Sequence, residues 1–276
     1  MIGQQELLRT IERQLKNNDF PQFTVFSGNG LLDKLELVGI IAKELKAEHV
    51  ITVSPKVDDV REIITNAYTQ RSPIVYGIME IDNASAQAKN SLLKLAEEPP
   101  ANVYIIISVK DANNLLKTLK SRAAVYTMQH YTQAELESYI KSQYAHKAKP
   151  NELEMVYNIC ETPDEIDLLL SNYEVADFWD YVELVADNIA EVSGANSFKI
   201  ADKLRIKDTD YQKYDLSLFF KAFQVVCAQQ YKIDRDSRYF AAVAVTGKVL
   251  NDMTKASLNK QMLVDNWILD VRKALR

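Results

Sequence analysis

The stretch "FTVFSGNGLLDKLELV", from Phe23 to Val38, decides the fold of the N-terminal part of this chain. Residues Phe23 to Gly28 are mainly apolar and predict a short buried strand. The apolar spacing that follows predicts a helix from about Lys34 to Leu45. A strand, a glycine-containing loop and a helix in this order are the setting of a phosphate-binding loop, which reads G-x-x-x-x-G-K-S/T.

Two positions of the loop segment, defined as Gly28 to Leu35, depart from that pattern. Gly28 and Lys34 stand at the required separation, but Asp33 replaces the second glycine and Leu35 replaces the hydroxyl residue that would hold Mg²⁺. A negative charge about 4 Å from a phosphate costs on the order of 4 kcal/mol at an intermediate effective dielectric. Lys34 could still pair with a phosphate, but its acidic neighbours Asp33 and Glu36 favour a solvated lysine in the first turn of the helix.

Strand-like and helix-like segments alternate as far as about residue 127. This alternation predicts a parallel sheet covered by helices on both faces, with any ligand at the carboxyl ends of the strands. The expected strands are Phe23 to Gly28, Val50 to Ser54, Pro73 to Ile81, Val103 to Val109 and Ala124 to Met128, and helices are expected at Val57 to Gln70 and Ala86 to Glu98.

The third expected strand ends in Met79 and Glu80. An ATPase would place an Asp-Glu pair here, in which the aspartate holds Mg²⁺ and the glutamate orients the attacking water. Methionine does not bind Mg²⁺. The alternative interpretation of Glu80 and Asp82 is that they cap or border the next helix, where carboxylates are favourable.

After Tyr131 the sequence is helical. Thr132 and Glu135 have the spacing of a capping box at the start of a helix. We predict an α/β plus all-α fold with an α/β domain at 1–130, a small helical domain at 131–174 and a larger helical domain at 175–276.

Composition excludes several classes of protein. The 276 residues are 47% hydrophobic and carry a formal net charge of −5, so the chain lacks the basic excess of a protein that grips nucleic acid by itself. Cys160 and Cys227 lie too far apart for a metal-ligand spacing and predict buried thiols. Apolar runs are too short for a membrane span, and the first residues do not read as a signal peptide. We therefore expect a cytoplasmic protein.

The most specific text is "NSLLKLAEEPPANVYIIISV", Asn90 to Val109, followed by "LLKTLKSRA", Leu115 to Ala123. It resembles sliding-clamp loader subunits of the AAA+ ATPase superfamily, most of all the bacterial DNA polymerase III delta-prime subunits. That family has an asparagine, a double leucine and lysine, Glu-Glu-Pro-Pro, a buried strand and a Ser-Arg-Cys triplet. Ser121 and Arg122 are kept here, and Ala123 replaces the cysteine.

Two departures from the family concern its other motifs. The stretch from Leu45 to Pro73 contains no cysteine, whereas bacterial loaders usually carry a four-cysteine zinc module there. This fits a shortened or phage-type version. The stretch from Glu161 to Leu170, where the family's nucleotide-sensing arginine should lie, has only acidic charges.

The resemblance implies an AAA+ domain, a helical lid and a helical collar over the three predicted domains. It places Met79 at the magnesium aspartate and Glu80 at the catalytic glutamate. Gly28, Lys34 and Glu80 would then be vestiges of a nucleotide site, with no cofactor or metal bound by this chain.

The resemblance also implies that Arg122, with Ser121, acts in trans as an arginine finger on ATP and Mg²⁺ held by a neighbouring subunit. The implied partners are loader ATPase subunits and a clamp-opening subunit in a hetero-pentamer and, through them, the sliding clamp and primer-template DNA. The alternative is an ordinary surface arginine near Asp111 or Glu97.

The expected function is therefore that of a non-hydrolysing loader subunit, a fixed neighbour within the assembly. Two alternatives remain. The chain could be an active ATPase with an irregular loop, which Lys34 and Glu80 favour, or an AAA+-derived scaffold outside replication.

Overall fold

The computed structural model describes residues 3–145, 149–192, 194–204, 213–253 and 259–276. The chain divides into two units, Met1–Glu135 and Leu136–Arg276. The further boundary expected near residue 174 stays a prediction.

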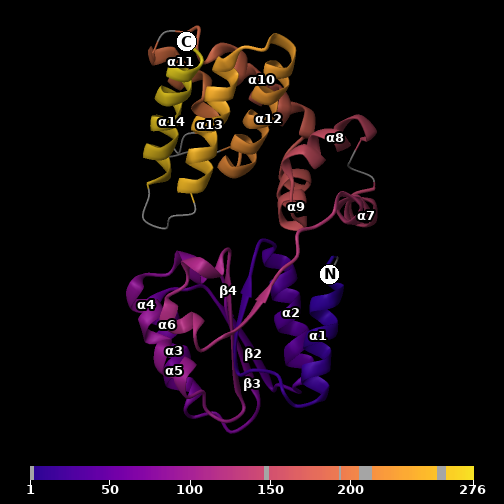
Figure 1. Ribbon diagram of the computed structural model, residues 1–276, viewed down its shortest axis with the longest axis vertical. Coiled ribbons are helices and arrows are strands. Elements are labelled where there is room, and N and C mark those ends of the chain that lie inside the picture. Colours follow the sequence, from indigo (N-terminus) through magenta and orange to yellow (C-terminus); the bar gives the residue numbers. More distant parts are fainter. Residues whose placement is uncertain (1–2, 146–148, 193, 205–212, 254–258) are drawn as a thin grey trace. The chain divides into compact units, whose positions relative to one another are not determined.

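A five-stranded parallel sheet forms the centre of the first unit (Figure 1). Its order is β2-β3-β4-β1-β5, so β1 lies between β4 and β5, and Ser27 at its carboxyl end pairs with both Val109 and Thr127. The predicted fold class is confirmed, and the strand bounds differ from the prediction by a few residues at most. The strands are β1 (Phe23–Ser27), β2 (His49–Val53), β3 (Ile74–Ile78), β4 (Val103–Val109) and β5 (Ala124–Thr127).

Helices cover both faces of this sheet. In Figure 1, α1 and α2 lie on one face and α3 to α6 on the other. Side chains alternate along each strand, so each strand contributes to two apolar cores, one on each face of the sheet. Phe26 packs with α1 and α2, and its neighbour Val25 packs with α3 to α6. The helices are α1 (Gln5–Lys16), α2 (Leu31–Glu44), α3 (Val57–Ala67), α4 (Ala86–Ser91), α5 (Leu93–Glu97) and α6 (Lys117–Lys120).

Two helices differ from the sequence prediction. The helix α2 begins at Leu31, three residues before the expected start, so it includes most of the loop segment. The single helix expected from Ala86 to Glu98 is divided into α4 and α5. At the break, the Leu92 N–H donates to the carbonyl oxygen of Lys89 (3.3 Å), three residues back instead of four.

The second unit is helical, as predicted, and its first helix, α7, begins within the last residues of the first unit. In its core, the indole ring of Trp267 on α14 lies 5.0 Å from the ring centroids of both Phe220 and Phe223 on α12. The helices are α7 (Gln133–Gln143), α8 (Pro150–Ile159), α9 (Pro163–Asn172), α10 (Val175–Asn188), α11 (Gly194–Ile200), α12 (Leu216–Asp234), α13 (Ser237–Asp252) and α14 (Lys260–Ala274). The capping box is confirmed, because the Thr132 N–H donates to Oε2 of Glu135 (2.8 Å) and the Glu135 N–H to Oγ1 of Thr132 (3.3 Å).

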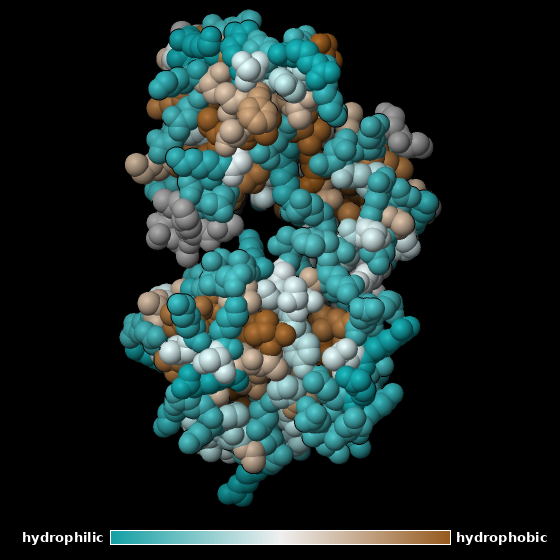
Figure 2. Space-filling view, in the orientation of Figure 1, coloured by the Kyte–Doolittle hydropathy of each residue, from teal (hydrophilic) through white to brown (hydrophobic). Residues whose placement is uncertain are grey.

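On the face shown in Figure 2, the surface is mainly hydrophilic, with separate hydrophobic patches on each unit. Among the described residues, no helix is long and apolar enough to cross a membrane.

Candidate functional site

The loop segment turns from β1 into α2 through two glycines with positive φ, Gly28 at 130° and Gly30 at 88°. A Cβ atom on Gly28 would lie 2.8 Å from Cβ of Met128, and one on Gly30 would lie 2.7 Å from the hydroxyl oxygen of Tyr131. Both glycines are therefore required by close approach as well as by backbone conformation. The residues just after β5 lie against the loop segment.

Lys34 is buried inside the loop segment, with only 4% of its surface exposed. Its Nζ donates to the carbonyl oxygens of Gly28 and Val109, the latter at 2.9 Å. The expectation of a solvated lysine is wrong. Because α2 begins at Leu31, the Lys34 side chain reaches back to carbonyl oxygens at the carboxyl ends of β1 and β4.

Asp33 is also buried, at 5% exposure, and its Oδ2 accepts a hydrogen bond from the hydroxyl of Tyr131. The loop segment thus holds two buried charges, and groups of the chain itself bond to both. Tyr131 was not singled out from the sequence. Its position after the expected fifth strand, next to β1 in the sheet, is the only signal that could have pointed to it.

The residues at the end of β3 do not form an acidic pair. Met79 is 7% exposed and packs in the apolar core beneath α1 and α2. Glu80 has left-handed backbone angles (φ 53°, ψ 49°), and its N–H donates to Oγ of Ser108 on β4 (2.7 Å).

Glu80 borders the short 3₁₀ helix that follows β3 and Asp82 lies within it, in keeping with the alternative interpretation that they cap or border the next helix. The Glu80 side chain makes no capping hydrogen bond to the short 3₁₀ turn Ile81–Asn83. Oδ2 of Asp82 instead accepts a hydrogen bond from the N–H of Lys110 (2.5 Å), just beyond β4. The positive φ of Glu80 turns the chain so that this carboxylate faces the end of β4.

Arg122 lies between α6 and β5 with 35% of its side chain exposed. Its Nη2 pairs with Oε1 of Glu97 at the end of α5 (2.7 Å). Its Nη1 donates to the carbonyl oxygen of Thr118 (2.8 Å) and to Oγ of Ser121 (3.4 Å). The structure therefore brings Arg122 and Ser121 together and adds Glu97, the neighbour named in the alternative interpretation.

The loop segment lies at the carboxyl ends of the strands, and Arg122 lies near their amino ends. Gly28 follows the carboxyl end of β1, whereas Arg122 precedes Ala124, which pairs with Thr24 near the amino end of β1. At about 3.3 Å per residue, the length of β1 alone separates these two ends of the sheet by roughly 13 Å. Within this unit, Gly28 and Lys34 lie together, and Arg122 does not reach them.

Comparison with known proteins identifies the type of fold and its relatives. A family model described as DNA polymerase III, delta subunit, matches residues 53–132. The DNA polymerase III subunit tau/gamma of Haemophilus influenzae is 27% identical over 178 residues, covering 53% of this chain and 25% of that protein. The DNA polymerase III subunit delta' of Buchnera aphidicola subsp. Baizongia pistaciae is 29% identical over 96 residues, covering 35% of this chain and 28% of that protein. Over these stretches the chain is similar to clamp-loader subunits of DNA polymerase III.

Solved structures show the same fold. A DNA polymerase III gamma subunit-related protein from Thermotoga maritima matches with a TM-score of 0.53 at 16% identity, covering 96% of this chain and 99% of that chain. The Thermotoga maritima RuvB Holliday junction branch migration motor matches with a TM-score of 0.52 at 17% identity, covering 95% and 88%. This chain spans between a quarter and about half of the length of the first curated relatives it matches, at 25% and 47%.

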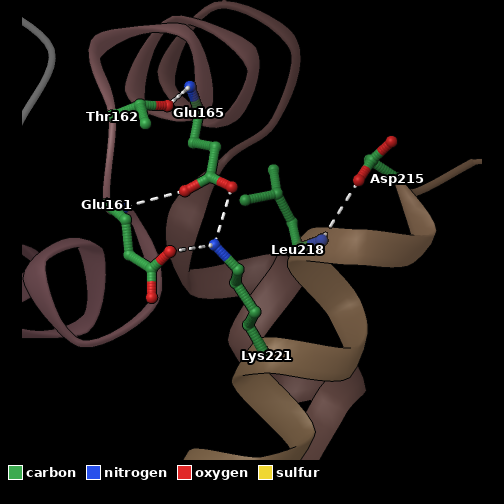
Figure 3. Close-up of polar contacts among 6 residues, drawn as sticks. All are labelled: Glu161, Thr162, Glu165, Asp215, Leu218 and Lys221. Atoms are coloured by element: carbon green, nitrogen blue, oxygen red, sulfur yellow. Dashed lines mark hydrogen bonds and ion pairs between the residues drawn. The ribbon is translucent and has the colours of Figure 1, made fainter. Parts of the chain in front are cut away.

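The acidic stretch from Glu161 to Leu170 is paired with a lysine from another helix of the second unit. Nζ of Lys221 on α12 pairs with Oε1 of Glu165 (2.7 Å) and Oε2 of Glu161 (3.2 Å), as Figure 3 shows. Thr162 caps α9 by accepting from the Glu165 N–H (3.3 Å). Burial alone would lower the pKa of Lys221, but the two carboxylates outweigh it and raise that pKa. Sequence reasoning missed Lys221, because it lies far along the chain from the acidic stretch it binds.

Both cysteines are buried and free, as predicted. Burial raises the pKa of the Cys227 thiol to about 12, and it also raises the pKa of the Cys160 thiol. Across the described ranges, no group of three or more His, Cys, Asp and Glu residues is arranged to hold a metal ion.

Proposed function

We propose that this chain is a DNA polymerase III-type clamp-loader subunit in DNA replication that does not hydrolyse ATP itself and supplies Arg122 to a neighbouring ATPase subunit. The observation that carries this proposal is the difference in burial and bonding between Lys34 and Arg122. Lys34 is buried and bonded to carbonyl oxygens of its own chain, whereas Arg122 is partly exposed at the opposite end of the strands.

Three features of the loop segment and its surroundings support the absence of hydrolysis. Leu35 offers no hydroxyl for Mg²⁺, and Met79 is an apolar core residue at the end of β3. Asp33 places a carboxylate in the first turn of α2, where a phosphate would otherwise meet backbone N–H groups. Gly28, Lys34 and Glu80 are in this proposal vestiges of a nucleotide site.

The location of Arg122 supports a role in trans. A guanidinium is planar and permanently charged, and it bonds to phosphate oxygens in a fixed fork geometry. An arginine supplied by a neighbouring subunit stabilises the charge of a phosphoryl-transfer transition state. This stabilisation can raise the rate of hydrolysis about a thousandfold or more. Because Arg122 does not reach its own loop segment, an ATP and Mg²⁺ bound to another subunit are the proposed target.

The proposed partners follow from the named relatives, which are DNA polymerase III subunits. They are loader ATPase subunits and a clamp-opening subunit in a hetero-pentamer, and through this complex the sliding clamp and primer-template DNA. The formal net charge of −5 agrees with contact to DNA through the complex and not through this chain alone.

The test uses the complex formed with the loader ATPase subunits that copurify with this chain from its native host. Arg122→Ala should lower DNA-stimulated ATP turnover at least about tenfold while size-exclusion chromatography shows the same assembly. Lys117→Ala is the matched control, because it removes an exposed positive charge from the adjacent helix α6. Equal turnover of the wild-type and Arg122→Ala complexes would overturn the proposal.

A further inference from the structure

The ion pair between Arg122 and Glu97 joins two short helices on one face of the sheet. Glu97 is the last residue of α5, and Arg122 follows α6. Both helices are anchored by apolar side chains that are fully buried in the same core, Leu95 on α5 and Leu119 on α6. The carboxylate and the guanidinium are therefore held on rigid supports and meet at 2.7 Å.

The contacts of the guanidinium leave part of its donor set available. Within the described part of the chain, Nη1 bonds to Thr118 and Ser121, Nη2 pairs with Glu97, and Nε makes no hydrogen bond. A guanidinium has five N–H donors. The contacts fix the orientation of the fork without using all of it, and the side chain is still 35% exposed.

Stability alone gives a weak reason for this arrangement. Glu97 is 51% exposed, and an ion pair between exposed side chains contributes little to folding because solvent screens it. Orientation is a stronger reason. A free arginine samples many rotamers, and a catalytic group must be held close to its productive geometry to be effective.

We infer that Glu97 is a positioning residue for Arg122: it holds the guanidinium in the orientation in which its remaining N–H donors meet a phosphate on the neighbouring subunit. This inference rests on the proposed function of Arg122. It assigns Glu97 no contact with the nucleotide.

The test compares variants in the same complex of this chain with its loader ATPase subunits. Glu97→Ala should lower the kcat of DNA-stimulated ATP hydrolysis about tenfold with the KM for ATP unchanged, because ATP binds to the neighbouring subunit. Glu97→Gln keeps a hydrogen-bond acceptor and should stay within about threefold of wild type. Glu98→Ala is the matched control, since it removes the same charge from the next residue, which makes no ion pair among the described residues.

A double-mutant comparison separates positioning from a general effect on the protein. In the Arg122→Ala background, Glu97→Ala should cause no further loss of kcat, because there is no guanidinium left to orient. In the isolated chain, the Nη resonances of Arg122 should be distinct in the wild type and averaged in Glu97→Ala, which reports the orientation without the partners.

The outcomes distinguish this inference from the proposed function. If Arg122→Ala leaves turnover unchanged, the proposed function fails. If Arg122→Ala lowers turnover but Glu97→Ala behaves like Glu98→Ala, the proposed function stands and the positioning role of Glu97 is wrong. An equal loss from Glu97→Ala in the wild-type and Arg122→Ala backgrounds would also overturn the positioning role.

Discussion

Tyr131 donates the hydrogen bond of its hydroxyl group to the buried carboxylate of Asp33, and its oxygen lies directly against Gly30. An aspartate at the glycine position of a phosphate-binding pattern is thus bonded to a side chain from beyond the last strand. Asp33, which we propose opposes phosphate binding, thus also ties the segment after β5 to the start of α2.

This hydrogen bond should contribute measurably to the stability of the first unit. Tyr131→Phe removes only the hydroxyl group and leaves the Asp33 carboxylate buried without this donor. We expect a loss of about 1.5–3 kcal/mol, as for hydrogen bonds to charged groups, measured by native-state hydrogen exchange at the amides of β1. Tyr104→Phe is the control, since the Tyr104 hydroxyl makes no hydrogen bond within the described ranges. Equal protection in the two variants would contradict this role of the Tyr131 hydroxyl.

The same geometry predicts weak nucleotide binding. Equilibrium dialysis of the isolated chain with ATP and Mg²⁺ should show no saturable binding below about 1 mM, because the Asp33 carboxylate alone costs on the order of 4 kcal/mol against a nearby phosphate. ADP should behave in the same way. A dissociation constant in the micromolar range would instead favour an active ATPase with an irregular loop.

Local sequence predicted the elements of the sheet well. The continuous apolar run "VYIIISV" gave the bounds of β4 correctly, from Val103 to Val109, because a strand buried on both faces needs no polar alternation. The division between α4 and α5 was missed, because it depends on a single backbone hydrogen bond at Leu92 that composition does not reveal.

The state of the loop segment could not be predicted, because its partners are distant in sequence. Lys34 bonds to the carbonyl oxygen of Val109, 75 residues away, and Asp33 bonds to Tyr131, 98 residues away. Side-chain identities at Asp33, Leu35 and Met79 indicated a changed site from sequence alone. The burial of Lys34 required the strand order, which brings the ends of β1, β4 and β5 together.

Lys221 should stabilise the second unit in a pH-dependent way. Its pKa is raised in the folded state by Glu165 and Glu161, against the effect of burial. A raised pKa means that folding favours the protonated lysine, so the stabilisation is fully present below its ordinary value of 10.5 and is lost as the pH rises through the folded-state pKa.

The variant Lys221→Met tests the direction of this pH dependence. At about pH 8 the variant should be less stable than wild type by about 1–3 kcal/mol, since Glu165 loses its half-buried partner. The difference should shrink as the pH is raised past the ordinary lysine pKa of 10.5 and through the raised folded-state pKa. Urea unfolding of both proteins over this pH range measures it, with Lys232→Met, an exposed lysine of the same helix, as the control. If the stability difference between wild type and Lys221→Met grew with pH, the proposed stabilisation by protonated Lys221 would be wrong.

The two thiols should be unreactive in the folded protein. The nucleophile in thiol chemistry is the thiolate, and burial raises the pKa of Cys227 to about 12 and raises that of Cys160 as well. With an aromatic disulfide reagent at about pH 8, we expect slow labelling in buffer and rapid labelling of both cysteines in urea. Rapid stoichiometric labelling without denaturant would show that one of these thiols is accessible.

Arg122→Lys keeps the positive charge and changes its geometry. A lysine ammonium is a compact charge on a flexible stem, so it cannot bond at once to Glu97 and the Thr118 carbonyl and still present a flat fork to phosphate. In the loader complex we expect DNA-stimulated turnover about tenfold or more below wild type, close to that of Arg122→Ala. Thermal unfolding of the isolated chain should change little, because the pair with Glu97 is exposed. Turnover of Arg122→Lys within about twofold of wild type would mean that charge alone suffices, and the fork geometry held by Glu97 would then have no catalytic role.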